Sequence, residues 1–347
     1  MRNAIKLKNE YLLKTEKLFT VNKNMWFDSF AKNFRTICTE ILKLQNEAII
    51  SSVSYLEYTM LRVDFIQRRY KATVFVYNHD SYLDKKQRIV GEYDISFLFV
   101  HFDSLWEVLL SLRRRYIGQI KAREIKSFML LALPDFYSYL INIARFALTD
   151  LIAESPFTEI AKNNSFRINV GDYMEVTETV FQREQKKEEK VKYPNRFGDF
   201  SGLDFSGRDF ISANLRYSQF RKSVFNNTIL YNCDLIGSNF NNAIMESCRL
   251  DCSFIYEADF SGAVLRNASF ISARGKSGLI NEDEWVQVGF FPVSFRQADL
   301  TNADFTGAIL SGADFSGAIL NGVNFTCTEL DGAIFDDDGK DAMPSRL

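Results

Sequence analysis

Residues 301–320 read TNADFTGAILSGADFSGAIL, and in this stretch a small residue stands two places before every Phe or Leu. The cleanest unit is Ala303-Asp304-Phe305-Thr306-Gly307. The same spacing runs from Phe200 to Phe270 and from Phe295 to Phe335, where each residue whose number is divisible by five is Phe, Leu, Met or Ile. Of these 24 positions, 22 have a small residue two places earlier, so the small residue belongs to the unit as much as the large one.

A period of five fits neither an α-helix, with about 3.6 residues per turn, nor a strand, with a repeat of about two. We therefore expect a chain that turns a corner once per unit, with large side chains stacked from coil to coil and small ones leaving room for them. The remaining Asp, Asn, Ser, Thr and Gly residues are typical of tight turns.

This unit resembles that of the pentapeptide-repeat family, which reads roughly Ala-Asp/Asn-Leu/Phe-x-x, and the resemblance covers about residues 196–338. It implies an all-β right-handed quadrilateral β-helix, a pentapeptide-repeat solenoid, with four units per coil. The 24 units would then form a rod of six coils, roughly 29 Å long at about 4.8 Å per coil.

Residues 271–294 interrupt the repeat, although Trp285 and Phe290 keep its phase and allow a degraded coil. We expect the stretch around Gly275–Glu284 to loop out and the coils to resume near Val286. Loops on rigid scaffolds carry recognition, while the alternative is a tolerated surface insertion. The candidate partner-binding residues here are Arg274, Lys276, Glu282, Asp283, Glu284 and Trp285. Gly275-Lys276-Ser277 imitates the end of a phosphate-binding loop, but Phe270 stands where its first Gly is needed.

The N-terminal part, residues 1–181, reads as an α+β domain without a recognisable motif. We expect a helix capped by Asn24, and a region of helix from Leu105 to about Ile152 with a break near Pro134. Alternating apolar residues predict three strands in a meander, with a turn at Asn78–Ser81. The strand residues are Val53, Tyr55, Thr59, Leu61, Val63 and Phe65, then Val74 and Val76, then Tyr93, Ile95, Phe97 and Phe99. A charged linker at 182–195 and a tail at 339–347 complete the predicted organisation.

The net charge of −2 conceals two opposite halves. Residues 1–196 hold 31 Lys and Arg against 24 Asp and Glu, whereas residues 197–347 hold 11 against 20. In the basic half, Arg113, Arg114 and Arg115, with Arg68 and Arg69, are a candidate partner-binding patch. The alternative is a solvated helix end, since a helix dipole favours cations in the last turn.

The composition argues against metal, cofactor and disulfide chemistry. The chain has two His and five scattered Cys, and Cys248-x-x-x-Cys252 lacks the companions of a zinc site. His79-Asp80 has no supporting signature. Phe128–Leu148 is apolar, but it contains Pro134, Asp135 and Arg145, so we expect a core helix rather than a membrane span. With no signal-peptide pattern at the start, we expect a reduced, bacterial, cytoplasmic protein without cofactors.

Three functions follow as hypotheses. The first is a non-enzymatic interaction scaffold that presents a rigid β-helical surface and the insertion to a partner protein. The second is a DNA mimic that binds a DNA-handling enzyme such as gyrase, which the resemblance and the acidic residues of 296–341 both suggest. The third is an unrecognised N-terminal enzyme or effector domain targeted by the repeats. We also expect a homodimer through the open C-terminal end of the β-helix, and no direct nucleic-acid binding.

Overall fold

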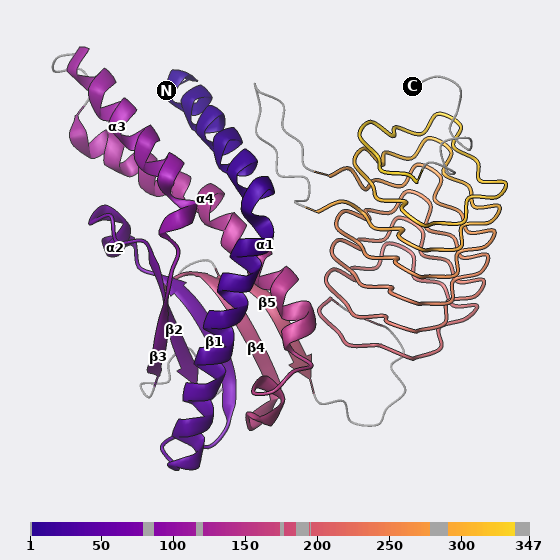
Figure 1. Ribbon diagram of the computed structural model, residues 1–347, viewed down its shortest axis with the longest axis horizontal. Coiled ribbons are helices and arrows are strands. Elements are labelled where there is room, and N and C mark those ends of the chain that lie inside the picture. The colour runs from indigo at the N-terminus through magenta and orange to yellow at the C-terminus, as the bar shows by residue number, and fades with distance from the viewer. Residues whose placement is uncertain are drawn as a thin grey trace. The chain divides into compact units, whose positions relative to one another are not determined.

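The computed structural model describes residues 2–78, 87–115, 121–173, 177–184, 194, 196–277 and 291–336. These form two compact units, an N-terminal unit that ends at Gln185 and a C-terminal unit that contains the repeats (Figure 1). Each unit is described by itself.

The N-terminal unit is a five-stranded sheet with helices. The helices are α1 (Arg2–Asn46), α2 (Arg62–Ile66), α3 (Val100–Arg115) and α4 (Ala122–Leu151), with short 3-10 helices η1 (Ser96–Leu98) and η2 (Phe157–Glu159). The strands are β1 (Val53–Met60), β2 (Lys71–Tyr77), β3 (Arg88–Asp94), β4 (Lys162–Asp172) and β5 (Thr177–Glu184). Their order in the sheet is β3-β2-β1-β4-β5, and β1 pairs with β4 in parallel. The α+β prediction agrees with this architecture.

The predicted three-stranded meander is wrong in extent, because β4 and β5 extend it on the β1 side. In β4 the buried residues Phe166, Ile168 and Val170 alternate as those of a strand do, so the signal was present in the sequence. Strand β5 runs to Glu184 and therefore takes up residues 182–184, which had been assigned to the linker.

Helix α1 begins at Arg2, so the predicted start at Asn24 is wrong. The apolar stripe continues toward the N-terminus through Leu12, Phe19 and Trp26, which are seven residues apart and buried. Phe19 packs on Tyr139 of α4, with ring centroids 5.4 Å apart. This contact between helices decides the extent of α1, since the core needs an apolar face along its whole length.

Three local predictions also need correction. Residues after Met60 form α2 instead of continuing the strand, and Val63 is exposed while Asp64 is buried. Residues 96–98 form η1 instead of a strand. Helix α4 does not break at Pro134. The proline removes only one backbone hydrogen-bond donor. Burial of its neighbours Leu133 and Phe136 in the core keeps the helix continuous. Of the predicted turn at 78–81, residues 79–81 lie outside the described residues.

Helix α4 is the one described helix that is long and apolar enough to cross a membrane by length and composition. In its most apolar window, 61% of the residues are buried inside the protein. The face of the helix that includes Met129, Phe136 and Ile143 belongs to the core of the N-terminal unit.

In the C-terminal unit, coils stack in parallel with one β-bridge per repeat. Residue 199 bridges residue 219, residue 204 bridges residue 224, and this spacing of 20 continues to residue 274. From Asp259, which bridges Ser294, the spacing becomes 35 for one coil before it returns to 20. The interruption therefore adds 15 residues without disturbing the register on either side of it. The repeat region is a β-helix, as expected (Figure 1).

One side of the core is a continuous column of phenylalanine rings. Consecutive rings are stacked with centroids 4.8–5.4 Å apart and planes within 21° of parallel. The column consists of Phe200, Phe220, Phe240, Phe260, Phe295, Phe315 and Phe335. Offset stacking of this kind adds to the hydrophobic gain, and it accounts for much of the Phe excess in the chain.

The small inward positions also satisfy the backbone. Where they hold a hydroxyl, it donates to a carbonyl oxygen 23 residues earlier: Ser223 to Phe200 at 2.8 Å, Thr228 to Phe205 at 2.9 Å and Thr328 to Phe305 at 2.8 Å. A buried hydroxyl is tolerated in the core because it has this partner.

Turn chemistry explains the polar residues of the unit. From 202 to 272 and from 297 to 332, the residue two places after each large one has φ between 54° and 78°, and in nine cases it is Gly. Just before the large residue, an Asp or Asn side chain accepts a backbone N–H from two residues on, as Asp204 does from Ser206 and Asp304 from Thr306, each at 2.8 Å. Corners with this acceptor are therefore fixed by their own residues.

Phe305→Ala is expected to lower the free energy of unfolding by about 3–5 kcal/mol, because Phe305 is fully buried and stacks between Phe270 and Phe325. Urea denaturation of the full chain measures this loss. The exposed Lys222→Ala is the control, with a change of at most about 0.5 kcal/mol expected. If the F305A curve overlays that of the unchanged protein, Phe305 does not point inward.

Candidate functional site

The interior of the β-helix is occupied by its own side chains. The central positions from Phe200 to Phe270 and from Phe295 to Phe315 are buried, with exposures of 4% or less. In this described part of the repeats, a partner protein would therefore contact the outward-facing residues.

The coil continues further into the interruption than predicted. Residues 271–273 form a regular corner, Arg274 bridges Phe254 and Ile309, and the Gly275 and Ser277 N–H groups donate to Ile309 and Ser311 at 2.8 and 2.9 Å. The predictions of a loop from about residue 275 and of an interruption from residue 271 are therefore both wrong. After it, Val293 is buried and Ser294 is paired again. The candidates Glu282, Asp283, Glu284 and Trp285, like Val286 and Phe290, lie outside the described residues.

Gly275 stands at the position that holds Phe, Leu, Met or Ile in the 24 regular repeats. A Cβ atom there would lie 2.4 Å from Cγ2 of Val293 and 2.9 Å from Cγ1 of Ile255. Val293 stands at a position that usually holds Ala or Ser, so here the large and small residues have exchanged roles. The exchange fills the core where the chain leaves and re-enters the helix. It also confirms that Gly275 serves packing and not a phosphate loop.

Of the predicted site residues in this region, Arg274 is exposed and Lys276 is half-buried. The Arg274 guanidinium lies over the Phe254 ring, 5.7 Å from its centroid, and Phe254 stacks on Tyr256 at 6.4 Å. Burial raises the pKa of Tyr256, and the charge of Arg274 opposes that rise. The structure thus brings two cations and two aromatic rings together on neighbouring coils.

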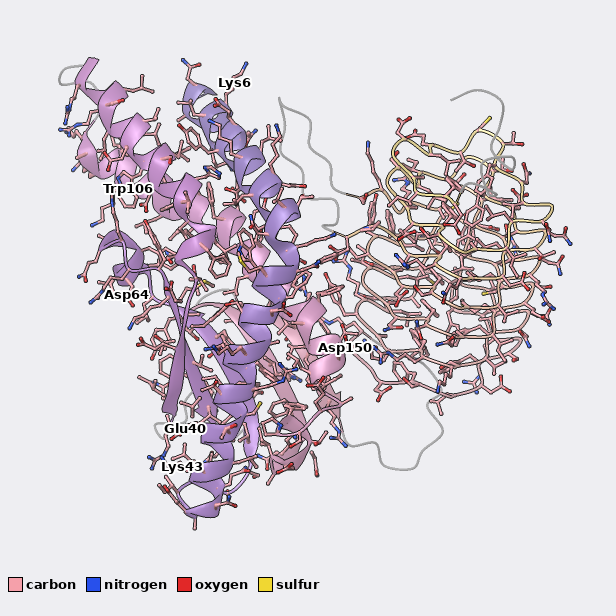
Figure 2. All side chains as sticks on the ribbon, viewed as in Figure 1. Lys6, Glu40, Lys43, Asp64, Trp106 and Asp150 are labelled. Carbon is pink, nitrogen blue, oxygen red and sulfur yellow. The ribbon has the colours of Figure 1, made fainter. Side chains whose placement is uncertain are left out.

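The predicted basic patch of the N-terminal unit is not one patch. Arg68 pairs with Glu107 and lies over Trp106, 5.7 Å from the ring centroid, and Arg69 pairs with Asp64 at 2.5 Å (Figure 2). Their charges are neutralised in place. Arg113 and Arg114 are exposed in the last turn of α3, the position a helix dipole favours, and the Arg115 side chain lies outside the described part.

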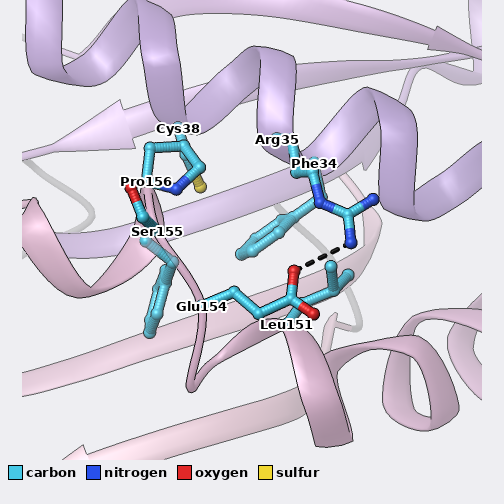
Figure 3. Close-up of a pocket in the computed structure, with 8 residues that line it drawn as sticks. Phe34, Arg35, Cys38, Leu151, Glu154, Ser155 and Pro156 are labelled. Carbon is cyan, nitrogen blue, oxygen red and sulfur yellow. Dashed lines mark hydrogen bonds and ion pairs between the residues drawn. The ribbon is translucent and has the colours of Figure 1, made fainter.

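The N-terminal unit has a small pocket between α1 and the end of α4, lined by Phe34, Arg35, Cys38, Leu151, Glu154, Ser155, Pro156 and Phe157 (Figure 3). Its empty volume of about 140 Å³ includes space open to the solvent and is still below the roughly 300 Å³ of the smallest ordinary ligand sites. Arg35 and Glu154 pair across it at 2.8 Å. Burial raises the pKa of Cys38 to about 12, so this thiol stays protonated and unreactive at neutral pH.

Other titratable groups of the N-terminal unit have structural partners. Glu57 accepts a hydrogen bond from the Tyr77 hydroxyl at 3.1 Å, and burial raises its pKa. Burial, with Arg183, lowers the pKa of Lys162 to about 8, but its amine donates to the carbonyls of Phe157 and Ile160. Burial, and then Lys14, lowers the pKa of His101, while His79 and Asp80 lie outside the described residues.

Within the described ranges, no three His, Cys, Asp or Glu residues are grouped to hold a metal ion. Two of the four cysteines of the repeats are buried, while Cys252 is half-buried and Cys327 is exposed. Cys233 and Cys248 are buried, and burial raises the pKa of both, to about 11 for Cys233.

Comparison with known proteins supports the repeat assignment. The family model of pentapeptide repeats matches residues 196–227, 228–267 and 298–337, with eight copies. The C-terminal part of this chain is a pentapeptide-repeat domain. The family model places its matches on the segments whose coils are regular, before and after the interruption.

Solved structures with similar repeats include three named proteins. A pentapeptide repeat protein from the thylakoid lumen of Arabidopsis thaliana is 27% identical over 31% of this chain, with a TM-score of 0.16, and the match spans 66% of its own length, just under two thirds. QnrB1, a plasmid-mediated fluoroquinolone resistance protein, is 18% identical over 42% of this chain and 96% of its own (TM-score 0.22). HetL, involved in heterocyst differentiation regulation in the cyanobacterium Nostoc, is 18% identical over 40% and 90% (TM-score 0.14). A search of curated proteins finds no match.

Several acids of the pentapeptide-repeat domain are engaged in its turns. Asp299, Asp304 and Asp314 each accept the N–H and the hydroxyl of the residue two places on. Asp299 and Asp314 also pair with Arg266 and Arg296. Burial alone would raise the pKa of Asp299, but the hydrogen bonds from Thr301 and Arg266 outweigh it and lower that pKa. These three carboxylates already have partners within the domain, and two of them are paired with arginines, which argues against a row of unpaired negative charges like that of a DNA mimic.

An apolar column was missed in the sequence. Val224, Ile244 and Val264 occupy the position before the large residue, which holds Asp or Asn in 11 of the 24 repeats, and each bridges the next on three successive coils. Ile244 is 41% exposed and the other two are half-buried. The spacing of 20 would have revealed the column once the coil length was fixed.

The Gly275 and Val293 exchange generates a stability prediction. Gly275→Ala is expected to lower the free energy of unfolding by about 1–3 kcal/mol, because its Cβ overlaps Val293. Adding Val293→Ala removes the overlapping methyl groups, so the double variant is expected to be more stable than Gly275→Ala alone. Chemical denaturation of all three variants measures the coupling, and strictly additive losses would show that the two residues do not share one space.

Proposed function

We propose that this chain is a non-enzymatic interaction scaffold whose β-helix, right-handed and four-sided, presents a rigid outer face to a partner protein. The observation that carries this proposal is the apolar column Val224–Ile244–Val264. A Val or Ile at this position cannot accept the corner hydrogen bond that Asp or Asn makes, and it leaves apolar surface in water. Both changes are unfavourable in the free protein and favourable once a partner covers the column.

The surroundings of the column fit a protein interface. Asn226, Glu246 and Arg266 lie two places further along on the same three coils, and they give the apolar column a polar edge. An apolar centre with a polar rim is typical of protein–protein interfaces. The stacked coils hold the column in a fixed geometry, so little ordering is needed on binding.

The other two functions have less support. For an enzyme, Arg35 and Glu154 pair with each other across the pocket beside Cys38, Glu57 and Lys162 are engaged in hydrogen bonds, and the pocket is small. For a DNA mimic, the engaged acids argue against a phosphate-like row. Buried thiols at Cys38, Cys233 and Cys248 are in keeping with the proposed cytoplasmic location, and we propose neither membrane nor direct nucleic-acid binding.

Ile244→Asp in the full-length chain is expected to abolish capture of the partner, because it places a carboxylate in the centre of the apolar column. Quantitative affinity capture from the native host measures this. Ile211→Asp is the matched control, since Ile211 is 62% exposed and stands in another column. Equal capture by both variants, or no protein enriched by the unchanged chain, contradicts the scaffold.

We also propose that the C-terminal end of the β-helix pairs with a second copy. Leu320 and Phe335 in the last coil are half-buried, whereas the equivalent residues of inner coils are buried. Light scattering at high micromolar concentration is expected to give twice the 40.1 kDa of the chain, and Phe335→Arg to return one chain mass with an unchanged circular dichroism spectrum. A single chain mass for the unchanged protein rules the dimer out.

A further inference from the structure

Three of the described ion pairs between coils of the β-helix follow one geometric rule, while Arg266 also lies 3.9 Å from Glu246 on the preceding coil. The cation stands just after a large residue, and the carboxylate stands just before the large residue of the next coil. Arg216 pairs with Asp234, and Arg296 with Asp314 at 3.1 Å, each 18 residues apart. Arg266 pairs with Asp299 at 2.6 Å, which is the same step lengthened by the 15 inserted residues.

Lys276 stands in the cation position of this rule, but the expected carboxylate is missing. The step that joins Arg266 to Asp299 leads from Lys276 to Ile309. Arg274 stands in the position that holds the carboxylate in this rule. Its bridge partners are Phe254 and Ile309, and neither is acidic. Within the described ranges, neither cation forms an ion pair, although four other arginines of the β-helix do.

Apolar and aromatic side chains surround these two charges. Arg274 lies over Phe254, which stacks on Tyr256, and Ile309 lies on the coil above. We call Phe254, Tyr256, Arg274, Lys276 and Ile309 the Arg274 patch. Arg274 is exposed and the other four residues are half-buried, so the patch is accessible without any rearrangement.

Carboxylates limit the patch along the rod. In the column of Arg274, Phe254 bridges Asp234 on one side and Ile309 bridges Glu329 on the other. The positive region is thus about two coils high, roughly 10 Å, which is the length of about three extended residues. A duplex nucleic acid would extend over both carboxylates, and residues 197–347 carry nine more negative than positive charges. A short acidic peptide avoids both obstacles.

We propose that the Arg274 patch binds a short segment of a partner protein in which two carboxylates flank an aromatic or aliphatic side chain. The carboxylates would form the charge-assisted bonds that Arg274 and Lys276 lack within the protein, and the apolar side chain would pack on Phe254, Tyr256 and Ile309. This inference rests on the proposed scaffold function and names a second contact, separate from the Ile244 column.

The experiment pans a random-peptide display library on the full-length protein, with the Arg274→Glu/Lys276→Glu double variant as the counter-selection. The peptides retained are expected to be rich in Asp and Glu next to an apolar residue. In fluorescence polarisation with the best synthetic peptide, the double variant is expected to weaken binding at least about tenfold. Lys222→Glu, the same charge change at an exposed corner elsewhere, is expected to have no effect.

Ile309→Asp is the sharper variant, because it supplies the carboxylate that the rule assigns to Lys276 and keeps both cations. It is expected to weaken peptide binding while the protein stays as stable as the unchanged chain in thermal unfolding. Retained peptides without acidic residues, or full binding by Ile309→Asp, overturn the proposal. Tighter binding of a short duplex DNA, lost in the double variant, would instead assign the patch to nucleic acid. Loss of peptide binding in a variant that still captures the partner through Ile244 separates this inference from the scaffold itself.

Discussion

Stacking of one large side chain on the next, every 20 residues, is the constraint on which the C-terminal unit depends. The seven-membered phenylalanine column shows its strictness, since ring separations stay within 4.8–5.4 Å even across the interruption. In each repeat, one large residue stacks in the core and one small residue packs beside it. The outward-facing residues can therefore vary without loss of the fold. Core and surface are therefore nearly independent in this protein.

This independence makes departures from the local rules informative. A left-handed residue follows the large residue at each corner from residue 200 to 272 and from 295 to 332, and an Asp or Asn precedes the large residue in 11 of the 24 repeats. Where Val224, Ile244 and Val264 stand in place of the acceptor, the side chain cannot form the corner hydrogen bond. Where Lys276 meets Ile309 instead of a carboxylate, an available ion pair is not made. Proteins break local consistency mainly at functional sites, so these two columns are where function is expected.

The sequence predicts the two units unequally for a physical reason. In the repeats, each residue's environment depends on residues at fixed spacings, so the residue number alone correctly assigns Phe305 to the core. In the N-terminal unit, environment depends on contacts between distant segments. The start of α1 was missed because Phe19 gains its partner, Tyr139, from α4. Helix α4 continues through Pro134 because its neighbours are buried, which local propensity does not reveal.

The same distinction governs the candidate site. Arg274 and Lys276 were selected from the sequence because they lie within the predicted interruption at 271–294, yet the reason given, a projecting loop, was wrong, since the coil continues through both. Their significance comes from Phe254 and Ile309, which are 20 and 35 residues from Arg274 and become neighbours only when the coil length and the 15-residue insertion are both known. An insertion in a solenoid thus changes which residues are vertical neighbours only for pairs that span it. Here it places Ile309, and not residue 294, above Lys276 and Arg274. The composition of the Arg274 patch is therefore a direct consequence of where the insertion lies.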